Sequence, residues 1–468
     1  MNFFSLIYLG IFSLIISVFS FFNIIYSYYF NLYLNLNCYI YSLIVSIVLG
    51  SIFIFQHKKK YKISIYYKIL TVVLGYFVLT FLISIPYYFS IYNLTFLDSY
   101  FESISGFTST GFTIFENIKH LDQSLILWRS SSQWIGGLYF LCSIILLIDI
   151  FDTSLKKTLT NFLSFDISET IKQSLKILIL YTVLTFFIFL ILKIIDLRTF
   201  DSFNLAMTLI SSGGFLPVNN LSSIINTNLK EIIFSFLMLI SFFSIFFVYN
   251  LLFFKKKNII FFQEDIYLLL YFLVILFSFF LLLNYGYNFS VILLSLTSSI
   301  SNMGVSLEKS PQNLSFIFLI LVIIGGSFFS TSSGIRFLKL YALFKFSINN
   351  LILHARPKNI FLNKYSLFNV NIEDIEINRY FLSVIVFIIS LFILSSLLTI
   401  SDISLESSFK LSILTIMNTV NSNTYGLDGF NFQDLRFFTK IYLIFFMIIG
   451  RIELLTLLII IKKFLLKN

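Results

Sequence analysis

Long apolar runs separated by short polar segments dominate the chain. About ten runs reach the roughly 20 residues that a helix needs to cross a bilayer. The first run has no basic leading segment and no small-residue cleavage site, so it is interpreted as a retained span rather than a signal peptide. The pattern predicts an all-α integral membrane protein of about ten transmembrane helices. The runs lie near residues 3–28, 39–55, 69–90, 128–151, 174–197, 230–254, 266–286, 314–345, 380–400 and 437–464.

Four connections between these runs are too long and too apolar to be simple turns. Each holds a short amphipathic run that ends in Ser, Thr, Asn and Gly, residues that stop a helix. This pattern is typical of a half-helix that enters the membrane and returns as extended chain. The segments are DSYFESISGFTSTGFTIF (98–115), DSFNLAMTLISSGGFLPVN (201–219), SVILLSLTSSISNMGVSLE (290–308) and LESSFKLSILTIMNTVNSNTYGLDGF (405–430).

Glycines in these segments indicate an internal repeat. Aligning Gly111, Gly213, Gly304 and Gly426 gives a unit of about a hundred residues, built as helix, re-entrant loop and helix. Irregular backbone at membrane depth must be buried in protein or face a water-filled cavity, so four such loops are expected to surround one central pore. Extended Gly-rich chain lets carbonyl oxygens replace the hydration shell of a cation. Close helix packing through small residues is the alternative, and it explains one such loop better than four.

The repeats divide the chain into six parts. An N-terminal helix pair precedes the first repeat, and a polar cytoplasmic linker separates the third repeat from the fourth. The third repeat has a broken second helix. The predicted boundaries are 1–60 for the helix pair, 61–155, 156–257 and 258–350 for the first three repeats, 351–379 for the linker and 380–468 for the fourth repeat.

Charge and composition then narrow the function. The chain is 58% hydrophobic and 12% charged, and its net charge of +10 falls in clusters between the apolar runs. One such cluster extends from Arg336 to Lys364. By the positive-inside rule these clusters place both termini in the cytoplasm and indicate orientation rather than a nucleic-acid partner.

Candidate chemistry of other kinds is sparse. Cys38 and Cys142 stand far apart, which favours neither a disulfide framework nor a zinc site. The runs hold almost no clustered His, Asp or Glu of the kind that a membrane enzyme needs, and no GxGxxG follows a strand pattern. We therefore expect a protein that is not an enzyme and has no bound organic cofactor.

Several segments are similar to a known family. ESISGFTSTGF (102–112) resembles its first pore loop, and LWRSSSQWIGG (127–137) resembles the start of the helix that follows. SGGF (212–215) and GRIELLT (450–456) are similar to its second loop and its last helix. On these segments the chain resembles the membrane subunits of the Trk and Ktr potassium-uptake systems over essentially its whole length. The extra N-terminal helix pair favours the TrkH type.

The resemblance implies uptake of potassium, or of a monovalent cation more generally, through a selectivity filter made by the four loops. In the fourth loop, NSNTYGLDG (421–429) departs from the Gly-rich run typical of the family, and two interpretations stay open: either Gly426, or the pair Asn423 and Thr424, lines the filter. The other implied filter residues are Thr110, Gly111, Ser212, Gly213, Met303 and Gly304.

A gate is implied where the eighth run is interrupted by GGSFFSTSSGIRFLK (325–339). A Gly/Ser kink without a gating role is the alternative. Arg451 lies inside the last run, where a charge is costly unless it faces a cavity or a partner. Glu453 lies on a different helix face and is expected to pair with a neighbouring segment. The implied gate residues are Gly325, Gly326, Ser332, Ser333, Gly334 and Arg451.

The resemblance also implies partners and a location. It implies a homodimer in the bacterial inner (cytoplasmic) membrane and a separate cytoplasmic TrkA-like nucleotide-binding regulatory subunit, with potassium as the transported ion and no nucleic acid. The function left open beside it is a secondary transporter for another ion or small solute, for example a sodium-coupled one. Such transporters are commonly built from two inverted halves, and four equivalent loops argue against that architecture.

Overall fold

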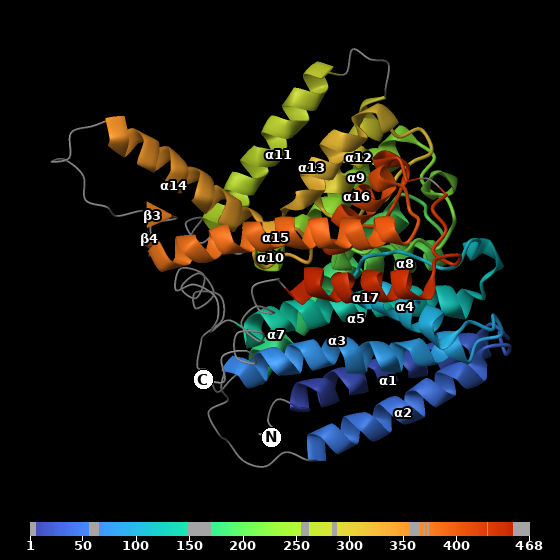
Figure 1. The fold of residues 1–468 in the computed structure, drawn as a ribbon. Helices are drawn as coiled ribbons and strands as arrows, with labels where there is room; N and C mark the ends of the chain where they lie inside the picture. Colours follow the sequence, from blue (N-terminus) through green and yellow to red (C-terminus); the bar gives the residue numbers. More distant parts are fainter. Residues whose placement is uncertain are drawn as a thin grey trace.

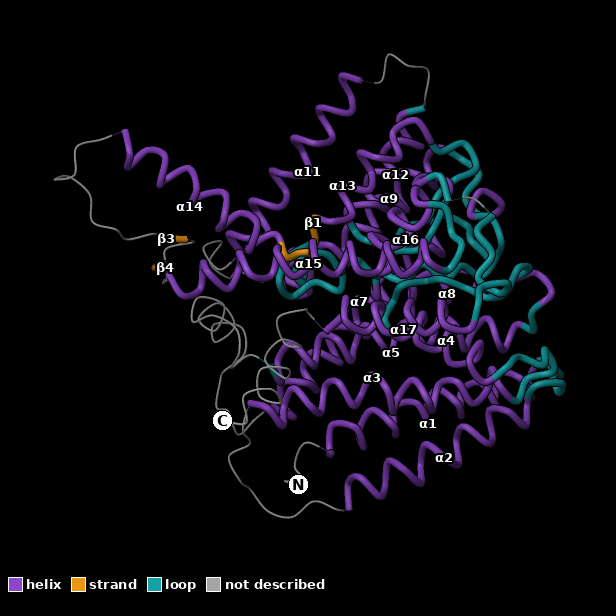
Figure 2. Tube along the Cα trace, viewed as in Figure 1, coloured by secondary structure: helices purple, strands orange, loops and turns teal. Residues whose placement is uncertain are grey.

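Helices make up most of the protein (Figures 1 and 2). The computed structural model describes residues 6–55, 65–147, 170–253, 262–282, 288–355, 366–367, 370–371, 374–427 and 429–452. Its longer helices and their continuations are α1 (Leu6–Tyr29), α2 (Leu36–Phe55), α3 (Ile65–Tyr88), α5 (Gln123–Leu146), α7 (Thr170–Ile194), α9 (Asn228–Phe242), α10 (Ile245–Leu252), α11 (Gln263–Leu282), α13 (Ser315–Ile323), α14 (Phe337–Ala355), α15 (Asp374–Ile400) and α17 (Phe437–Ile452).

Six of the described helices, namely α1, α2, α3, α7, α11 and α15, are long and apolar enough to cross a membrane. Small polar side chains lie at contacts between these helices, and many large apolar ones face outward. In the contact between α1 and α2, Ser20 Oγ lies 3.0 Å from Ser42 Oγ, while Phe21 and Phe22 on the other face of α1 are exposed. This distribution is typical of helices that pack against each other in lipid. The protein is a multi-pass membrane protein.

Four short helices precede the irregular connections that gather at one end of the bundle (Figure 2). With 12 or 13 residues each, they are too short to span a bilayer. Side-chain caps start two of them: Thr95 Oγ1 accepts the N–H of Asp98, and Ser404 Oγ accepts the N–H of Ser407. The four half-helices are α4 (Phe96–Phe107), α8 (Thr199–Ser211), α12 (Phe289–Ile300) and α16 (Leu405–Ile416).

The remaining elements are short. Strand β1 pairs in parallel with β2, and β3 pairs antiparallel with β4. Their bounds, with those of the 3₁₀ turns, are β1 (Ile324–Gly325), β2 (Ile335–Arg336), β3 (Ser366–Leu367), β4 (Val370–Asn371), η2 (Ile118–His120), η4 (Leu221–Ser223), η7 (Gln312–Leu314) and η9 (Asn423–Tyr425).

The four repeats close into a ring. Helix α5 of the first repeat packs on α8 of the second, α9 on α12 of the third, α13 on α16 of the fourth, and α17 of the fourth on α4 of the first. The second and fourth repeats therefore stand opposite each other. Helices α1 and α2 pack on one another and on α3, outside the ring (Figure 1). The predicted fold class, four helix–pore-loop–helix repeats with an extra N-terminal pair, is confirmed.

Two of the apolar runs are broken rather than one. The interruption predicted in the eighth run lies between α13, which ends at Ile323, and α14, which begins at Phe337. The run 230–254, predicted as one helix, is also divided: α9 ends at Phe242 and α10 begins at Ile245. The cause is a contact from the next helix, because the N–H of Ser244 donates to Asp265 Oδ1 on α11 at 2.8 Å. That bond satisfies a donor which the helix break leaves open.

Candidate functional site

The four loops that follow the half-helices share one backbone hydrogen-bond pattern. In each loop a carbonyl near the end of the half-helix accepts the N–H of the residue five positions later. This pattern fixes the register between the loops without reference to residue type. The bonds run from Thr110 to Ser105 (2.9 Å), from Gly213 to Thr208 (2.9 Å), from Met303 to Ser298 (3.0 Å) and from Thr419 to Leu414 (2.9 Å).

The residue before each of these donors has a left-handed backbone conformation. The φ angles are 58° at Ser109, 55° at Ser212, 59° at Asn302 and 46° at Asn418. Positive φ is uncommon outside glycine and costs free energy that the surroundings must offset. Its repetition at four equivalent positions marks the point where each half-helix turns into extended chain.

The residues after the donors form one layer. They are Gly111, Gly214, Gly304 and Val420. A Cβ atom on Gly111 would lie 2.9 Å from Gly214 Cα, and one on Gly304 would lie 2.8 Å from the backbone nitrogen of Val420. Gly111 and Gly304 also have φ angles of 81° and 72°. Glycine is therefore required where these backbones meet.

This register differs from the glycine alignment made from the sequence. Gly214, not Gly213, stands at the position of Gly111. Gly213 instead faces the helix after the first loop, where its Cβ would meet the end of the Gln133 side chain. The run Ser-Gly-Gly permits two alignments, and only the hydrogen bonds distinguish them.

The fourth loop departs further from the glycine alignment than the second loop does. Val420 holds the glycine position, whereas Gly426 follows η9, where its Cβ would lie 3.2 Å from Lys410 Nζ. Thr424 is buried, and Asn423 lies in the wall of the outer cavity. The structure therefore places the three fourth-loop candidates outside the layer.

Hydroxyl groups clamp three of the loops a second time. The residue whose carbonyl accepts the loop N–H also donates its side-chain hydroxyl to a carbonyl seven positions later. Leu414 stands at this position in the fourth repeat and has no hydroxyl. The clamps are Ser105 Oγ to Phe112 O (2.6 Å), Thr208 Oγ1 to Phe215 O (3.1 Å) and Ser298 Oγ to Val305 O (2.7 Å).

An outer cavity of about 600 Å³ opens onto the layer. All four loops contribute to its wall, so the described parts of all four repeats share this space. Residues of the wall include Gly111, Thr113, Gly214, Val305, Val420 and Asn423.

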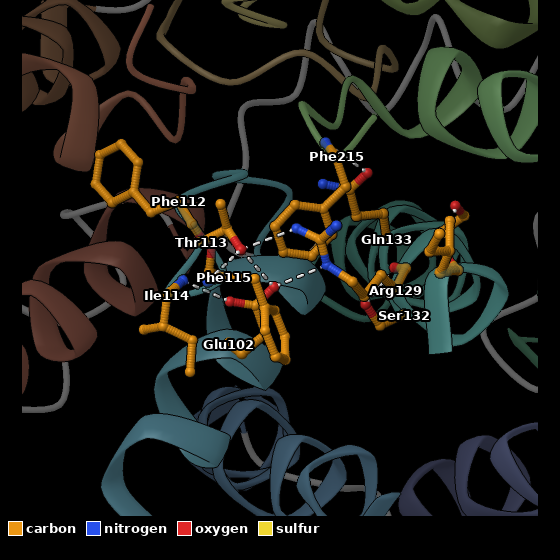
Figure 3. A network of polar contacts seen from close by, with 12 residues as sticks. Glu102, Phe112, Thr113, Ile114, Phe115, Arg129, Ser132, Gln133 and Phe215 are labelled. Atoms are coloured by element: carbon orange, nitrogen blue, oxygen red, sulfur yellow. Dashed lines mark hydrogen bonds and ion pairs between the residues drawn. The ribbon is translucent and has the colours of Figure 1, made fainter. Parts of the chain in front are cut away.

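A buried ion pair supports the first loop (Figure 3). Arg129 Nε on α5 donates to Glu102 Oε1 on α4 at 2.9 Å, and both side chains are almost fully buried. Glu102 Oε2 accepts the N–H of Ile114 at 3.0 Å, and Thr113 Oγ1 donates to Glu102 Oε1 at 3.0 Å. Arg129 Nη2 donates to Thr113 Oγ1 at 2.9 Å. The carboxylate thus holds the returning strand of the loop by its backbone.

Helix α5 also holds the second loop. The Arg129 guanidinium lies 4.2 Å from the centre of the Phe215 ring. With its amide oxygen turned toward the loop, Gln133 accepts the N–H groups of Gly214 and Phe215 at 3.1 Å each. One helix therefore positions the strands of two neighbouring loops, and Figure 3 shows Arg129 and Gln133 on its two successive turns.

The predicted gate segment is a closed loop between the paired strands β1 and β2. Gly325 pairs with Arg336 across this short ladder, and Gly334 has a φ of 83°. The N–H of Gly326 donates to Ser332 Oγ at 3.0 Å. Thr331 Oγ1 donates to the carbonyl of Ile210 at the end of α8 at 2.7 Å, which brings the loop against the base of the second pore loop.

Arg336 lies inside this loop. Its Nη1 donates to Ser327 O at 3.0 Å, to Ser330 Oγ at 3.1 Å and to Ser332 O at 3.1 Å. The residue is only 3% exposed. Arg336 was expected in a basic cytoplasmic cluster, and these hydrogen bonds hold its charge within the loop rather than in solvent. The side of the membrane on which it lies stays a prediction.

Arg451 on α17 lies beside the same loop. It donates through Nη1 to Ser333 Oγ, and its guanidinium lies 4.2 Å from the centre of the Phe140 ring. Among the described residues, its Nε and Nη2 have no hydrogen-bond partner. Glu453 lies outside the described residues, so its expected pairing stays a prediction.

No protein-family model matches the chain. An uncharacterized cation transporter of Methanocaldococcus jannaschii is 26% identical over 357 residues, which are 75% of this chain and 73% of the relative. The Trk system potassium uptake protein TrkH of Salmonella typhimurium is 24% identical over 439 residues, 89% of each chain.

The crystal structure of the potassium transporter TrkH from Vibrio parahaemolyticus covers 98% of both chains with a TM-score of 0.82, at 20% identity. The chain is similar to TrkH-type potassium uptake proteins in sequence over most of its length, and to one of them in fold. The structural match shows that this chain has the fold of that transporter. The sequence relatives named here are transporters rather than enzymes.

The pattern of apolar runs did not identify two further residues of this site. Glu264 and Asp265 lie in the first turn of α11, where Glu264 is half-buried and Asp265 is buried. Glu264 Oε1 accepts the N–H of Phe328 in the gate segment at 3.0 Å, as Asp265 accepts that of Ser244. Two adjacent carboxyl groups at the start of an apolar run are the signal that could have identified them.

Proposed function

We propose that this TrkH-type chain takes up potassium, or another monovalent cation, through a pore along the axis of its four loops. The observation that carries the proposal is the common hydrogen-bond register, which brings Gly111, Gly214 and Gly304 together at one layer. The names of its relatives, potassium uptake proteins and a cation transporter, support it.

The electrostatics of the loops favour a cation. Each half-helix ends next to the layer, so its C-terminal end, which carries partial negative charge, lies beside the pathway. Extended glycine backbone then offers carbonyl oxygens in place of water. We assign the filter to Thr110, Gly111, Gly213, Gly214, Met303, Gly304, Thr419 and Val420, with Ser212 at the turn and Asn423 in the outer wall.

The gate in this proposal is the segment between β1 and β2. It lies against the base of the second pore loop through Thr331, and Arg451 places a positive charge beside it through its bond to Ser333. Arg451→Ala removes this electrostatic barrier and is expected to raise basal cation flux. Flux below that of the wild type, at equal membrane abundance, would contradict the role.

The proposal extends to assembly and location. The basic clusters between apolar runs support a cytoplasmic-membrane protein with both termini in the cytoplasm. By resemblance, the chain forms a homodimer and is regulated by a separate TrkA-like nucleotide-binding subunit. Potassium is its cargo, and no organic cofactor is needed for passive conduction through such a pore.

The experiment is growth at low potassium of a bacterial strain that lacks its own uptake systems, with this chain and its regulatory partner expressed. Wild type is expected to restore growth, whereas Gly111→Ser should not, since the added side chain meets Gly214 and Val420. Failure of the wild type to restore growth, despite confirmed membrane insertion, would overturn the proposed function.

Gly429→Asn is the matched control. Gly429 also has a positive φ of 66°, but no atom lies within 4 Å of the position that its Cβ would take. Asn tolerates this backbone conformation better than most residues. The control is expected to restore growth as the wild type does, so a defect confined to Gly111→Ser reports on the layer itself.

A further inference from the structure

The fourth loop supplies a side chain where the other three supply none. By the hydrogen-bond register, Val420 is equivalent to Gly111, Gly214 and Gly304. Its φ is not among the positive ones, so valine is accommodated there without backbone strain. The question is where its isopropyl group lies relative to the axis.

Contacts with the neighbouring loop give the first part of the answer. A Cβ on Gly111 would lie 3.0 Å from Val420 Cγ2. The first and fourth repeats are neighbours in the ring through α4 and α17. This contact alone would be compatible with a side chain that stays at the rim.

Contacts with the opposite loop are decisive. A Cβ on Gly214 would lie 2.6 Å from Val420 Cβ and 3.0 Å from its Cγ1. A carbon–carbon single bond is about 1.5 Å long, so Gly214 Cα and Val420 Cβ are no more than about 4 Å apart. Because the second and fourth repeats face each other across the axis, the valine side chain reaches over the pathway.

An apolar group in this place opposes ion passage. A cation entering from the outer cavity must exchange water for carbonyl oxygens, and an isopropyl group offers no such ligand. Apolar constrictions gate channels by excluding water from a narrow segment. Val420 also lines the outer cavity, so it stands at the boundary between that cavity and the layer.

We propose that the Val420 side chain is an apolar constriction at the outer end of the filter, and that the rate of cation passage is set by moving it aside. The inference rests on the proposed function. It explains why Gly111 and Gly214 have no room for a side chain: the fourth loop fills the space that they leave.

The test is rubidium flux into liposomes that contain the purified full-length protein, with a series at position 420. Flux should rise from Val420→Ile through wild type and Val420→Ala to Val420→Gly. For Val420→Gly we expect about a tenfold increase, which corresponds to a barrier lower by about 1.4 kcal/mol. Val18→Ala, on the exposed face of α1, is the control for incorporation.

The outcomes separate this inference from the proposed function. If the wild type carries no rubidium at all, the proposed function fails. If the wild type conducts and Val420→Gly and Val420→Ala are unchanged or slower, the constriction is refuted while cation conduction stands. If Val420→Gly folds poorly, Val420→Ile and Val420→Ala still test the inference. Higher flux in Val420→Ile than in wild type, with lower flux in Val420→Ala, would refute it.

Discussion

The filter loops and the gate segment are both irregular chain at membrane depth, but they are held in different ways. Each filter loop is bonded to its own half-helix, as when Ser105 accepts one backbone N–H of its loop and clamps a carbonyl of the same loop. Helix α5 adds contacts to the first two loops. The gate segment has internal bonds from Arg336, but several distant helices also hold it. The carbonyl of Phe242 accepts the N–H of Ser327 at 3.0 Å, and Glu264 and Arg451 reach the segment from other helices.

In the proposed function, this difference separates ion selection from gating. A loop that is fixed by bonds to its own half-helix keeps its shape when other helices shift, as a coordinating ring must. A loop held by several distant helices responds to any of them, because each contact is lost when its helix moves. Discrete rearrangement of such packed contacts is the usual basis of switching.

The largest effect is expected from Glu102→Gln in the filter support. Glutamine keeps the shape but leaves the Arg129 charge buried without its counter-ion, which typically costs about 3–5 kcal/mol. We expect a marked fall in thermal stability in detergent and loss of rubidium uptake. Glu116→Gln, at an exposed carboxylate that accepts from Asn431, is the control. Equal stability of Glu102→Gln and wild type would show that the ion pair does not support the loop.

A smaller effect is expected from Gly214→Ala, which tests the register. The new Cβ meets Val420 Cβ and Met303 O, and overpacking of this kind costs about 1–3 kcal/mol. If this cost adds to the free-energy barrier for ion passage, rubidium flux falls about tenfold or more. In Gly213→Ala the new Cβ meets the end of a flexible side chain, Gln133, so a milder loss is expected. A stronger defect in Gly213→Ala would restore the sequence-based alignment.

Arg336→Gln tests the gate side of the comparison. The substitution removes the guanidinium that donates to three oxygens of the gate segment, and hydrogen bonds of a charged group contribute about 1.5–3 kcal/mol each. A loosened segment should raise basal rubidium flux several-fold without changing the preference between potassium and sodium. A changed ion preference would mean that gate and filter are not separate.

The smallest effect is expected from Ser298→Ala, which makes the third loop resemble the fourth. It removes one hydroxyl clamp, whose hydrogen bond contributes about 1 kcal/mol to the free energy of folding. Thermal stability and the potassium-to-sodium permeability ratio should therefore both fall slightly. Ser295→Ala, which loses only a bond to Val291 O within its own helix, is the control. Identical permeability ratios in both variants would show that the clamp does not contribute to selection.

The apolar pattern predicted the repeats and the break in the eighth run because length and hydrophobicity of a span are strong, local signals. The apolar pattern did not predict the break at Ser244, because the residue that bonds to it, Asp265, comes from another helix. The place of Val420 in the layer was not predicted, because the loops were aligned by their glycines. The burial of Arg336 was not predicted either, because a charge between apolar runs was interpreted as a cytoplasmic residue. Each missed feature depends on a contact between distant segments.

The most direct test of the central claim, that the layer of Gly111, Gly214, Gly304 and Val420 is the cation pathway, is the reversal potential in planar bilayers with potassium on one side and sodium on the other. The wild type should prefer potassium, Gly429→Asn should retain that preference, and Gly111→Ser should lose it. A Gly111→Ser protein that conducts with the wild-type reversal potential would contradict the claim.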